Sequence, residues 1–185
     1  DRVPRADKLS KEFAATRVAS QLLARSLSQG ESTPLSTVRD QEVLAGAAHR
    51  VLGYLDDGRG RRINMGFGDG NATLKVDPHV ARALLDQWER LLRDNLPYGS
   101  LPPSYGRTQL AEMWLLLDEP DRARNVLHGA YLPRGGCDRK LVAIWLHLND
   151  PAQALALVGD DQSPSRGLCR MDIARWYEAH GDAAT

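Results

Sequence analysis

The sequence predicts an all-α fold: an array of helix-turn-helix repeats with one small β-hairpin inserted near residues 61–76. Two observations predict the array. Trp114, Trp145 and Trp176 follow one another at equal intervals, and the segments around the first two align without a gap, with Leu, Trp and Pro at the same places. A fixed period of about 20 to 50 residues is typical of one supersecondary unit stacked several times. We therefore expect two full copies and the first half of a third.

Each copy has the pattern of two short helices joined by a tight turn. In the first copy, Leu110, Met113 and Trp114 fall at positions i, i+3 and i+4, which share one helical face. Pro120 and Pro151 then stand where a second helix begins, and proline is well placed there because its missing N–H has no helical partner to lose. The second helices present small and apolar residues, namely Ala123, Val126 and Leu127, and Ala154, Leu157 and Val158.

The spacing of small and large residues across each copy extends this pattern. The matching positions are Leu110, Ala111, Trp114, Ala123, Leu127 and Ala130 in the first copy, Leu141, Val142, Trp145, Ala154 and Val158 in the second, and Ile173 and Trp176 in the third. This series resembles the tetratricopeptide repeat, in a divergent form. The resemblance implies stacked helix pairs whose first helices line a concave surface that binds a peptide or a partner protein.

Three features depart from that family. The period, at about 31 residues, is shorter than the family's usual length of roughly 34 residues, and the closing proline is missing. The second copy has Asp161 where the first has Ala130. Related helix-pair repeats therefore remain an alternative, as does a helical bundle without repeats.

Four segments are expected along the chain. Residues 1–57 form a helical pair, residues 58–77 the β-hairpin insertion, residues 78–106 a helix followed by a Pro/Gly-rich linker, and residues 107–185 the repeats. The apolar residues expected along the first three helices are Leu9, Phe13, Val18, Leu22 and Leu27; then Leu44, Ala48, Val51, Leu52 and Leu55; then Val80, Leu84, Trp88, Leu91 and Leu92. The third helix is expected to begin at Asp77-Pro78, an N-cap followed by proline.

The hairpin prediction rests on alternating apolar and polar residues on both sides of the turn-forming segment 68–71. Gly66, Gly68 and Gly70 raise the alternative of a phosphate-binding loop. That spacing is not the dinucleotide-binding G-x-G-x-x-G, and no Gly-Lys-Ser/Thr follows. An enzyme or nucleotide-binding module using residues 66–70 is thus the lesser alternative.

The charge and the polar residues give little support to other functions. Lys and Arg number 24, and Asp and Glu also number 24, so no basic surface is indicated for nucleic acid or an anionic membrane. No segment has the roughly 20 apolar residues that span a bilayer, so we expect no direct membrane insertion. The five histidines form no metal-binding motif, and no serine or cysteine has a catalytic signature. The protein is therefore expected not to be an enzyme and to use no cofactor or metal.

Cys137 and Cys169 each lie near the first helix of a copy. Equivalent positions on neighbouring helices are about 8–10 Å apart, which exceeds the roughly 7 Å Cα limit for a disulfide. An offset of one residue from strict register would bring them nearer, but two buried free thiols are the expectation.

The predicted function is a non-catalytic scaffold for protein–protein interaction within a larger bacterial assembly. The resemblance implies a partner-binding groove lined by Thr108, Glu112, Arg139, His147, Arg170, Tyr177 and Glu178. Within it, Arg139 and Arg170 lie one repeat apart and would clamp a carboxylate of the partner. Self-assembly into a homo-oligomer, through exposed apolar ends of the array, is the alternative.

The ends of the chain guide the expected location. The chain opens at Asp1 without an initiator methionine and ends within the third copy, so we expect a processed form or a fragment of a longer protein. An envelope or periplasmic location is preferred to the cytoplasm.

Overall fold

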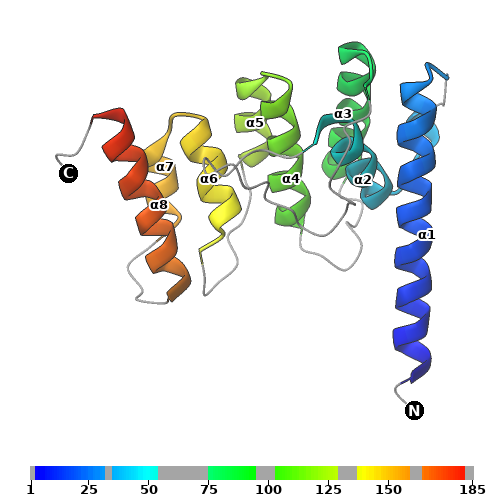
Figure 1. Cartoon of the computed structure of the whole chain (residues 1–185), viewed down its shortest axis with the longest axis horizontal. Coiled ribbons are helices and arrows are strands. Elements are labelled where there is room, and N and C mark those ends of the chain that lie inside the picture. Colours follow the sequence, from blue (N-terminus) through cyan, green and yellow to red (C-terminus); the bar gives the residue numbers. More distant parts are fainter. Residues whose placement is uncertain are drawn as a thin grey trace. The chain divides into compact units, whose positions relative to one another are not determined.

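The computed structural model describes residues 3–31, 35–53, 75–94, 103–128, 137–158 and 164–181. Within these residues the chain forms eight α-helices and one short 3₁₀-helix, with no β-strand, so the all-α prediction is confirmed (Figure 1). The chain divides into two compact units, Asp1–Val126 and Leu127–Thr185.

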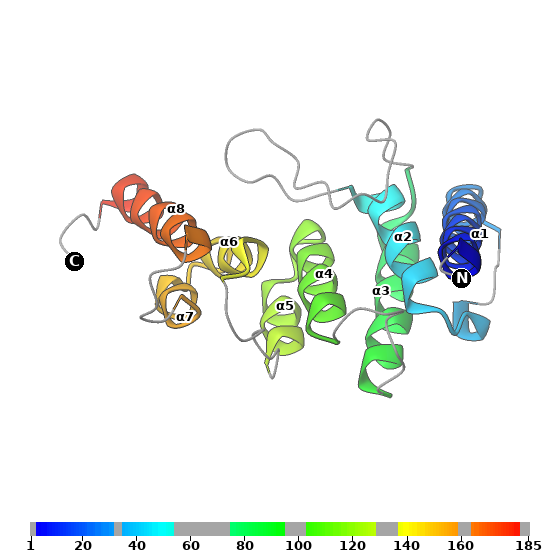
Figure 2. The ribbon, with the colours of Figure 1, turned by 90° about the horizontal axis from the view of Figure 1, so that it is seen from below.

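The first unit contains most of the described helices. They are α1 (Val3–Ser28), η1 (Leu35–Thr37), α2 (Gln41–Leu52), α3 (Pro78–Arg93), α4 (Pro103–Leu116) and α5 (Pro120–Leu127), whose last residue falls in the second unit. Helix α1 packs along α2, and α2 also contacts α3 and α4 (Figure 2). Figure 1 shows the N-terminal half of α1 running on beyond α2. Consistent with this, residues 11–15 of α1 are exposed.

Helix α2 is the centre of the first unit, and most of its residues are buried. Its alanines and Gly46 let α1 approach closely, because a Cβ atom added to Gly46 would stand 2.5 Å from Ser20 Oγ. The exposed fractions of Trp88 and Trp114 are both 0%, which makes them the largest wholly buried side chains among the described residues. These large rings fill the space between helices, whereas small residues elsewhere let the helices pack closely.

Helix starts follow the sequence rules closely. Asp77 caps α3 by accepting a hydrogen bond from the His79 backbone N–H at 2.7 Å, and Pro78 follows it, as predicted. Asp40, Asp138 and Asp150 cap α2, α6 and α7 in the same manner. Each carboxylate satisfies backbone donors that have no partner within the first helical turn.

The second unit contains three helices: α6 (Arg139–His147), α7 (Pro151–Ala156) and α8 (Pro164–His180). Helix α6 contacts both of the others, and α7 also contacts α8. The buried apolar side chains of these three helices, and of the turns after α6 and α7, are Leu141, Val142, Ile144, Trp145, Leu148, Ala154, Val158, Cys169 and Ile173.

The turns that end α4 and α6 have the same geometry, one sequence period apart. After α4, the Glu119 N–H donates to the Trp114 carbonyl at 2.9 Å, and the Asp118 N–H donates to the Leu115 carbonyl at 3.0 Å. After α6, the equivalent bonds of Asp150 and Asn149 are both 3.0 Å long. Each turn is a Schellman motif followed by a proline that opens the next helix.

The third predicted copy begins like the other two but ends differently. Helix α8 closes on Gly181, which has a φ of +82°. Gly181 lies five residues after Trp176, whereas Asp118 and Asn149 lie four residues after their tryptophans. Helix α8 is therefore one residue out of register at its C-terminal end.

The predicted β-hairpin, near residues 61–76, lies almost wholly outside the described residues. Of that range, only Lys75 and Val76 are described, and neither belongs to a strand. The predicted linker up to Gly106 is shorter than expected, because α4 already begins at Pro103.

Helix α1 also differs from its predicted pattern. Leu23 and Leu27 are buried, but the exposed fractions of Val18 and Leu22 are 53% and 62%. The physical reason is the helical period. At about 100° per residue, Val18 and Leu22 lie on the side of α1 opposite Leu27, so a single partner helix cannot cover all of them.

Candidate partner-binding site

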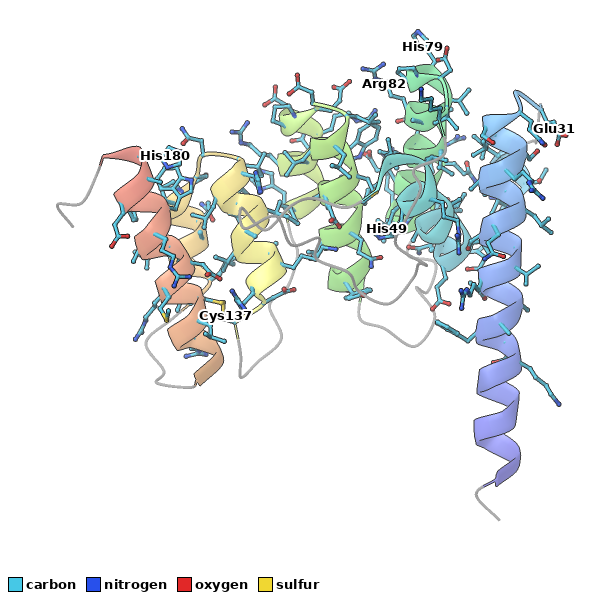
Figure 3. All side chains as sticks on the ribbon, viewed as in Figure 1. Glu31, His49, His79, Arg82, Cys137 and His180 are labelled. Carbon is cyan, nitrogen blue, oxygen red and sulfur yellow. A yellow bond between two sulfur atoms is a disulfide. The ribbon has the colours of Figure 1, made fainter. Side chains whose placement is uncertain are left out.

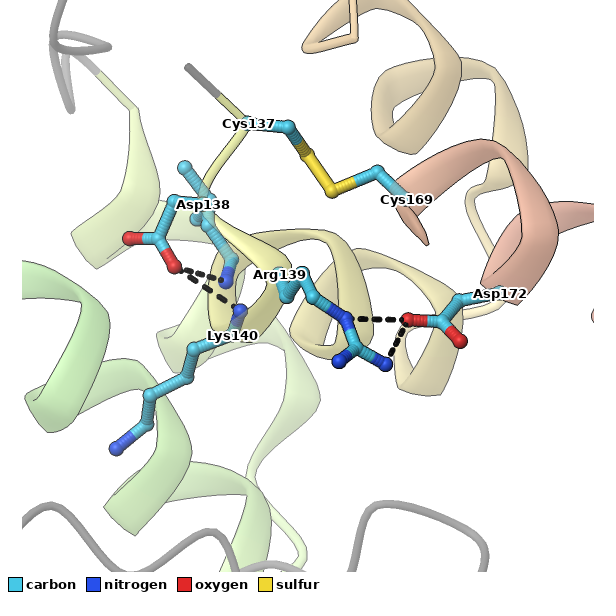
Figure 4. Close-up of a disulfide and its surroundings, with 7 residues drawn as sticks. Cys137, Asp138, Arg139, Lys140, Cys169 and Asp172 are labelled. Carbon is cyan, nitrogen blue, oxygen red and sulfur yellow. Dashed lines mark hydrogen bonds and ion pairs between the residues drawn. A yellow bond between two sulfur atoms is a disulfide. The ribbon is translucent and has the colours of Figure 1, made fainter. Parts of the chain in front are cut away.

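A disulfide joins Cys137 to Cys169 in the second unit (Figure 4). The expectation of two free thiols is therefore wrong. Cys137 lies just before α6 and Cys169 lies within α8, so the pair is offset from strict repeat register. That offset brings the two Cα atoms to 6.5 Å, inside the range that a disulfide requires.

An ion pair lies beside the disulfide and joins the same two helices. Arg139 donates from Nε and Nη2 to Asp172 Oδ2, at 2.9 and 2.7 Å (Figure 4). Both side chains are partly exposed, with exposed fractions of 48% for Arg139 and 23% for Asp172. A partner carboxylate at Arg139 would therefore compete with Asp172.

The other predicted groove residues of the second unit are accessible. His147, Arg170 and Glu178 are exposed, and Tyr177 is half-buried. Tyr177 packs edge-on against Trp176, with ring centroids 5.4 Å apart. Arg170 and Tyr177 lie seven residues apart on α8, which puts them on one face of that helix.

The end of α8 has an aromatic stack of its own. His180, which is labelled in Figure 3, stacks on Trp176, with ring centroids 4.0 Å apart, and its Nδ1 lies 2.8 Å from the Trp176 carbonyl. Because Trp176 packs between His180 and Tyr177, the last two turns of α8 form a small aromatic surface.

The two predicted groove residues of the first unit have different surroundings. Thr108 and Glu112 lie on α4, and their exposed fractions are 3% and 0%. Both side chains are thus closed off from solvent, and a partner would meet their helix without contacting them.

A cluster of ion pairs holds α3 against α5 in the first unit. Arg122 contacts Asp86 at 2.7 Å and Glu89 at 2.9 Å, and its guanidinium carbon lies 3.8 Å from the ring centre of Trp114. Burial by itself lowers the pKa of Arg122, but the hydrogen bond to Asp86 and the charge of Glu89 more than offset it, so that the pKa is raised. Arg122 is held in its charged form and contributes to structure.

A second ion pair extends this contact toward the start of α5. Arg82, which is labelled on α3 in Figure 3, donates from Nε to Glu119 at 3.0 Å. Glu119 is also the residue whose N–H closes the Schellman motif after α4. The turn between α4 and α5 is therefore bound to α3 through its side chain as well as to α4 through its backbone.

A hollow of about 350 Å³ is lined by residues of both α1 and α2. Its described lining consists of Val18, Gln21, Leu22 and Arg25 of α1 together with Arg50 of α2. The sequence pattern does not predict this hollow, because it places Val18 and Leu22 in the same apolar stripe as Leu27. The sequence does contain a signal for the hollow. Val18, Gln21, Leu22 and Arg25 stand at i, i+3, i+4 and i+7, so they share a separate face of α1.

Among the described residues, no three His, Cys, Asp or Glu side chains gather as metal ligands would. The described helices also include none that is long and apolar enough to cross a membrane.

Comparisons with known proteins give no likeness from which to argue. No protein-family model matches the chain, and the searches of curated proteins and of solved structures found no significant match.

Proposed function

We propose that this chain is a scaffold for protein–protein interaction, built from divergent tetratricopeptide-like helix pairs. The observation that carries the proposal is the recurrence of one turn after α4 and after α6. Trp, a left-handed residue, an acidic residue and proline stand at matching places one sequence period apart, with matching hydrogen bonds. Local geometry repeated at a fixed period is what helix-pair repeats need, and such repeats are used chiefly to bind other proteins.

The binding face in this proposal is the accessible side of α6 and α8. His147, Arg170 and Glu178 supply exposed polar groups there, and Tyr177 supplies a part-exposed aromatic ring. Tyrosine and arginine are the residue types enriched at the energetically important positions of protein interfaces. The partner is a protein or peptide with at least one carboxylate, which Arg170 would bind.

The disulfide supports a place for this scaffold in an oxidising compartment. Structural disulfides persist in secreted, periplasmic and cell-surface proteins and are rare in the cytosol. Because Cys137 and Cys169 join α6 to α8, oxidation fixes the two helices that carry the proposed binding face.

The test is site-specific photo-crosslinking in cells that express the chain. A photoreactive amino acid is placed at His147, Arg170 or Glu178 in separate variants. Matched control variants carry it at Gln153 of α7 or Asn125 of α5, which are also exposed. We expect the same partner to be captured from the three test positions and from neither control. Capture from all five positions alike, or from none, rejects the proposal.

Self-assembly is the second candidate function, and one observation favours it. The exposed fractions of Leu155, Leu168 and Met171 in the second unit are 53%, 45% and 48%. Sedimentation velocity on the purified chain decides: an oligomer that dissociates in a Leu168→Ser/Met171→Ser variant supports it. If the chain is a monomer at all concentrations and the crosslinks above are retained, self-assembly is rejected and the scaffold proposal is kept.

A further inference from the structure

The hollow lined by α1 and α2 has two apolar side chains beside two arginines. Val18 and Leu22 are more than half exposed. Arg25 is exposed beside them, and Arg50 reaches the same hollow from α2. The described lining contains no acidic residue. The hollow therefore has positive charge beside apolar surface and nothing acidic in that lining to balance it.

Arg50 has guanidinium nitrogen atoms that lack an acceptor among the described residues. Its Nε and Nη2 atoms are withdrawn from solvent and have no hydrogen-bond partner in the described structure. A guanidinium removed from water without an acceptor is destabilising, and a carboxylate, which can accept two parallel hydrogen bonds, is its best complement.

The charge of α1 points the same way. Along Val3–Ser28 there are five basic residues, Arg5, Lys8, Lys11, Arg17 and Arg25, and two acidic ones, Asp7 and Glu12, which leaves a net charge of +3. An acidic partner would be attracted to this helix before contact, and its carboxylates would then meet Arg25 and Arg50.

We propose that this hollow docks an acidic amphipathic helix of a partner protein, whose apolar side chains cover Val18 and Leu22 and whose carboxylate binds Arg50. The spacing of Val18, Leu22 and Arg25 along one face of α1 suits a helix lying beside it, since both would present residues at i, i+3 and i+4. A volume of about 350 Å³ holds a few side chains of such a helix rather than a folded domain. This site lies in the first unit and does not depend on the face proposed on α6 and α8.

A lipid surface fits the observations less well. Helices that lie in a membrane interface keep their apolar residues on one side and their charges on the other. On α1, the exposed apolar residues Val18 and Leu22 lie opposite the buried Leu23 and Leu27. That arrangement suits a helix covered by protein on two sides.

The experiment is a display selection with randomised helical peptides, each about four turns long, on the full chain. Enriched peptides are then measured by fluorescence anisotropy against the wild type and against Leu22→Ser and Arg50→Gln. Leu155→Ser is the matched control, because the exposed fraction of Leu155, 53%, resembles that of Leu22. Circular dichroism melting checks that each variant is folded.

We expect enriched peptides to carry Asp or Glu one helical turn from Leu, Ile or Val. We also expect Leu22→Ser and Arg50→Gln each to weaken their binding at least tenfold, Leu155→Ser to leave it unchanged, and added salt to weaken it. The proposal is overturned if no peptide is enriched, if the enriched peptides lack acidic residues, or if both variants bind like the wild type. Binding to phosphatidylglycerol vesicles that Leu22→Ser abolishes would overturn it in favour of a lipid contact.

Discussion

Asp118 and Asn149, at matching positions of the turns after α4 and α6, hold the same left-handed backbone conformation, with φ angles of 58° and 56°. Each residue ends the first helix of a pair and starts the turn into the second. Most side chains are strained there, by roughly 1–2 kcal/mol, while Asp and Asn tolerate the conformation and glycine is unstrained. Both turns thus constrain the same position, four residues after a tryptophan.

The first prediction concerns these two residues. Asp118→Gly and Asn149→Gly should each leave stability unchanged or raise it by up to about 1 kcal/mol, because glycine adopts a positive φ freely. Asp118→Val and Asn149→Val should each cost about 1–2 kcal/mol, because a β-branched side chain clashes with the backbone there. Urea unfolding measures both. If valine were tolerated as well as glycine, the left-handed turn would be wrong.

The disulfide gives the second prediction. It closes a loop of 32 residues, so replacing both cysteines with serine should destabilise the second unit by about 3–4 kcal/mol, through the greater freedom of the unfolded chain. Unfolding of the wild type should respond to a reductant in the same direction. The double variant is the control, and a response of the variant to the reductant would contradict this account.

Gly46 supplies the third prediction. In Gly46→Ala the new methyl group would stand 2.5 Å from Ser20 Oγ and 2.8 Å from Ser20 Cβ, so α1 and α2 must separate slightly. We expect a loss of about 1–3 kcal/mol, the usual range for overpacking, measured by urea unfolding. Adding Ser20→Gly to Gly46→Ala should restore part of the loss, whereas equal stability of the single and double variants would place the damage elsewhere.

The fourth prediction separates Arg122 from an ordinary surface arginine. Arg122 contacts Asp86, Glu89 and the ring of Trp114, while Arg93 makes one contact to Glu89 within its own helix. Arg122→Ala should therefore cost about 1–2 kcal/mol and Arg93→Ala less than about 0.5 kcal/mol, in thermal unfolding at low salt. Arg122→Lys should not restore the loss, because an ammonium group lacks the planar fork. Equal costs at the two arginines would argue against the cluster.

Glu42 makes stability depend on pH. Burial first, and the neighbouring charge of Asp40 second, raise the pKa of the Glu42 carboxyl above its usual value. A carboxyl whose pKa is higher in the folded state binds its proton more tightly there, so its favourable contribution is complete below the unfolded pKa. It is lost as the pH rises through the folded pKa.

The fifth prediction follows from that sign. Glu42→Gln, which stays neutral, should gain stability relative to the wild type as the pH rises from about 4 to about 7, and the two proteins should be close in stability below about pH 4. Urea unfolding across that range measures the difference. Glu178→Gln is the control, since Glu178 is exposed. A gain for Glu42→Gln that was the same at every pH would contradict the raised pKa.

The helices themselves were predictable because their signals are local. Asp77 followed by Pro78 predicts the start of α3, since a cap and a fixed φ act within one turn of the chain. The turns after Trp114 and Trp145 were likewise visible as acidic or amide residues before proline.

The disulfide was missed because it depends on how far two helices slide along each other. Sequence spacing gives the interaxial distance of about 8–10 Å, yet the observed Cα distance is 6.5 Å. Cys137 lies in the segment before its helix rather than on it, which the helical pattern alone did not indicate.

The sequence pattern also failed to predict which side of some helices is buried. Thr108 and Glu112 were expected to line a groove because of their repeat positions, yet packing closes both off from solvent. Val18 and Leu22 read as core residues by type, yet the partner helix covers the other side of α1. Which face is covered depends on tertiary contacts, and residue type alone does not carry that information.

The bond between Cys137 and Cys169 also changes what the second unit does under mechanical load. It encloses the whole of α6 and α7 within one covalent loop. When the two ends of that unit are pulled apart, tension passes through the two sulfur atoms, so the enclosed residues bear none of it. The 32 residues of that loop, at roughly 3.5 Å each, correspond to about 110 Å of extended chain, which can unfold under tension only after a reductant has broken the disulfide.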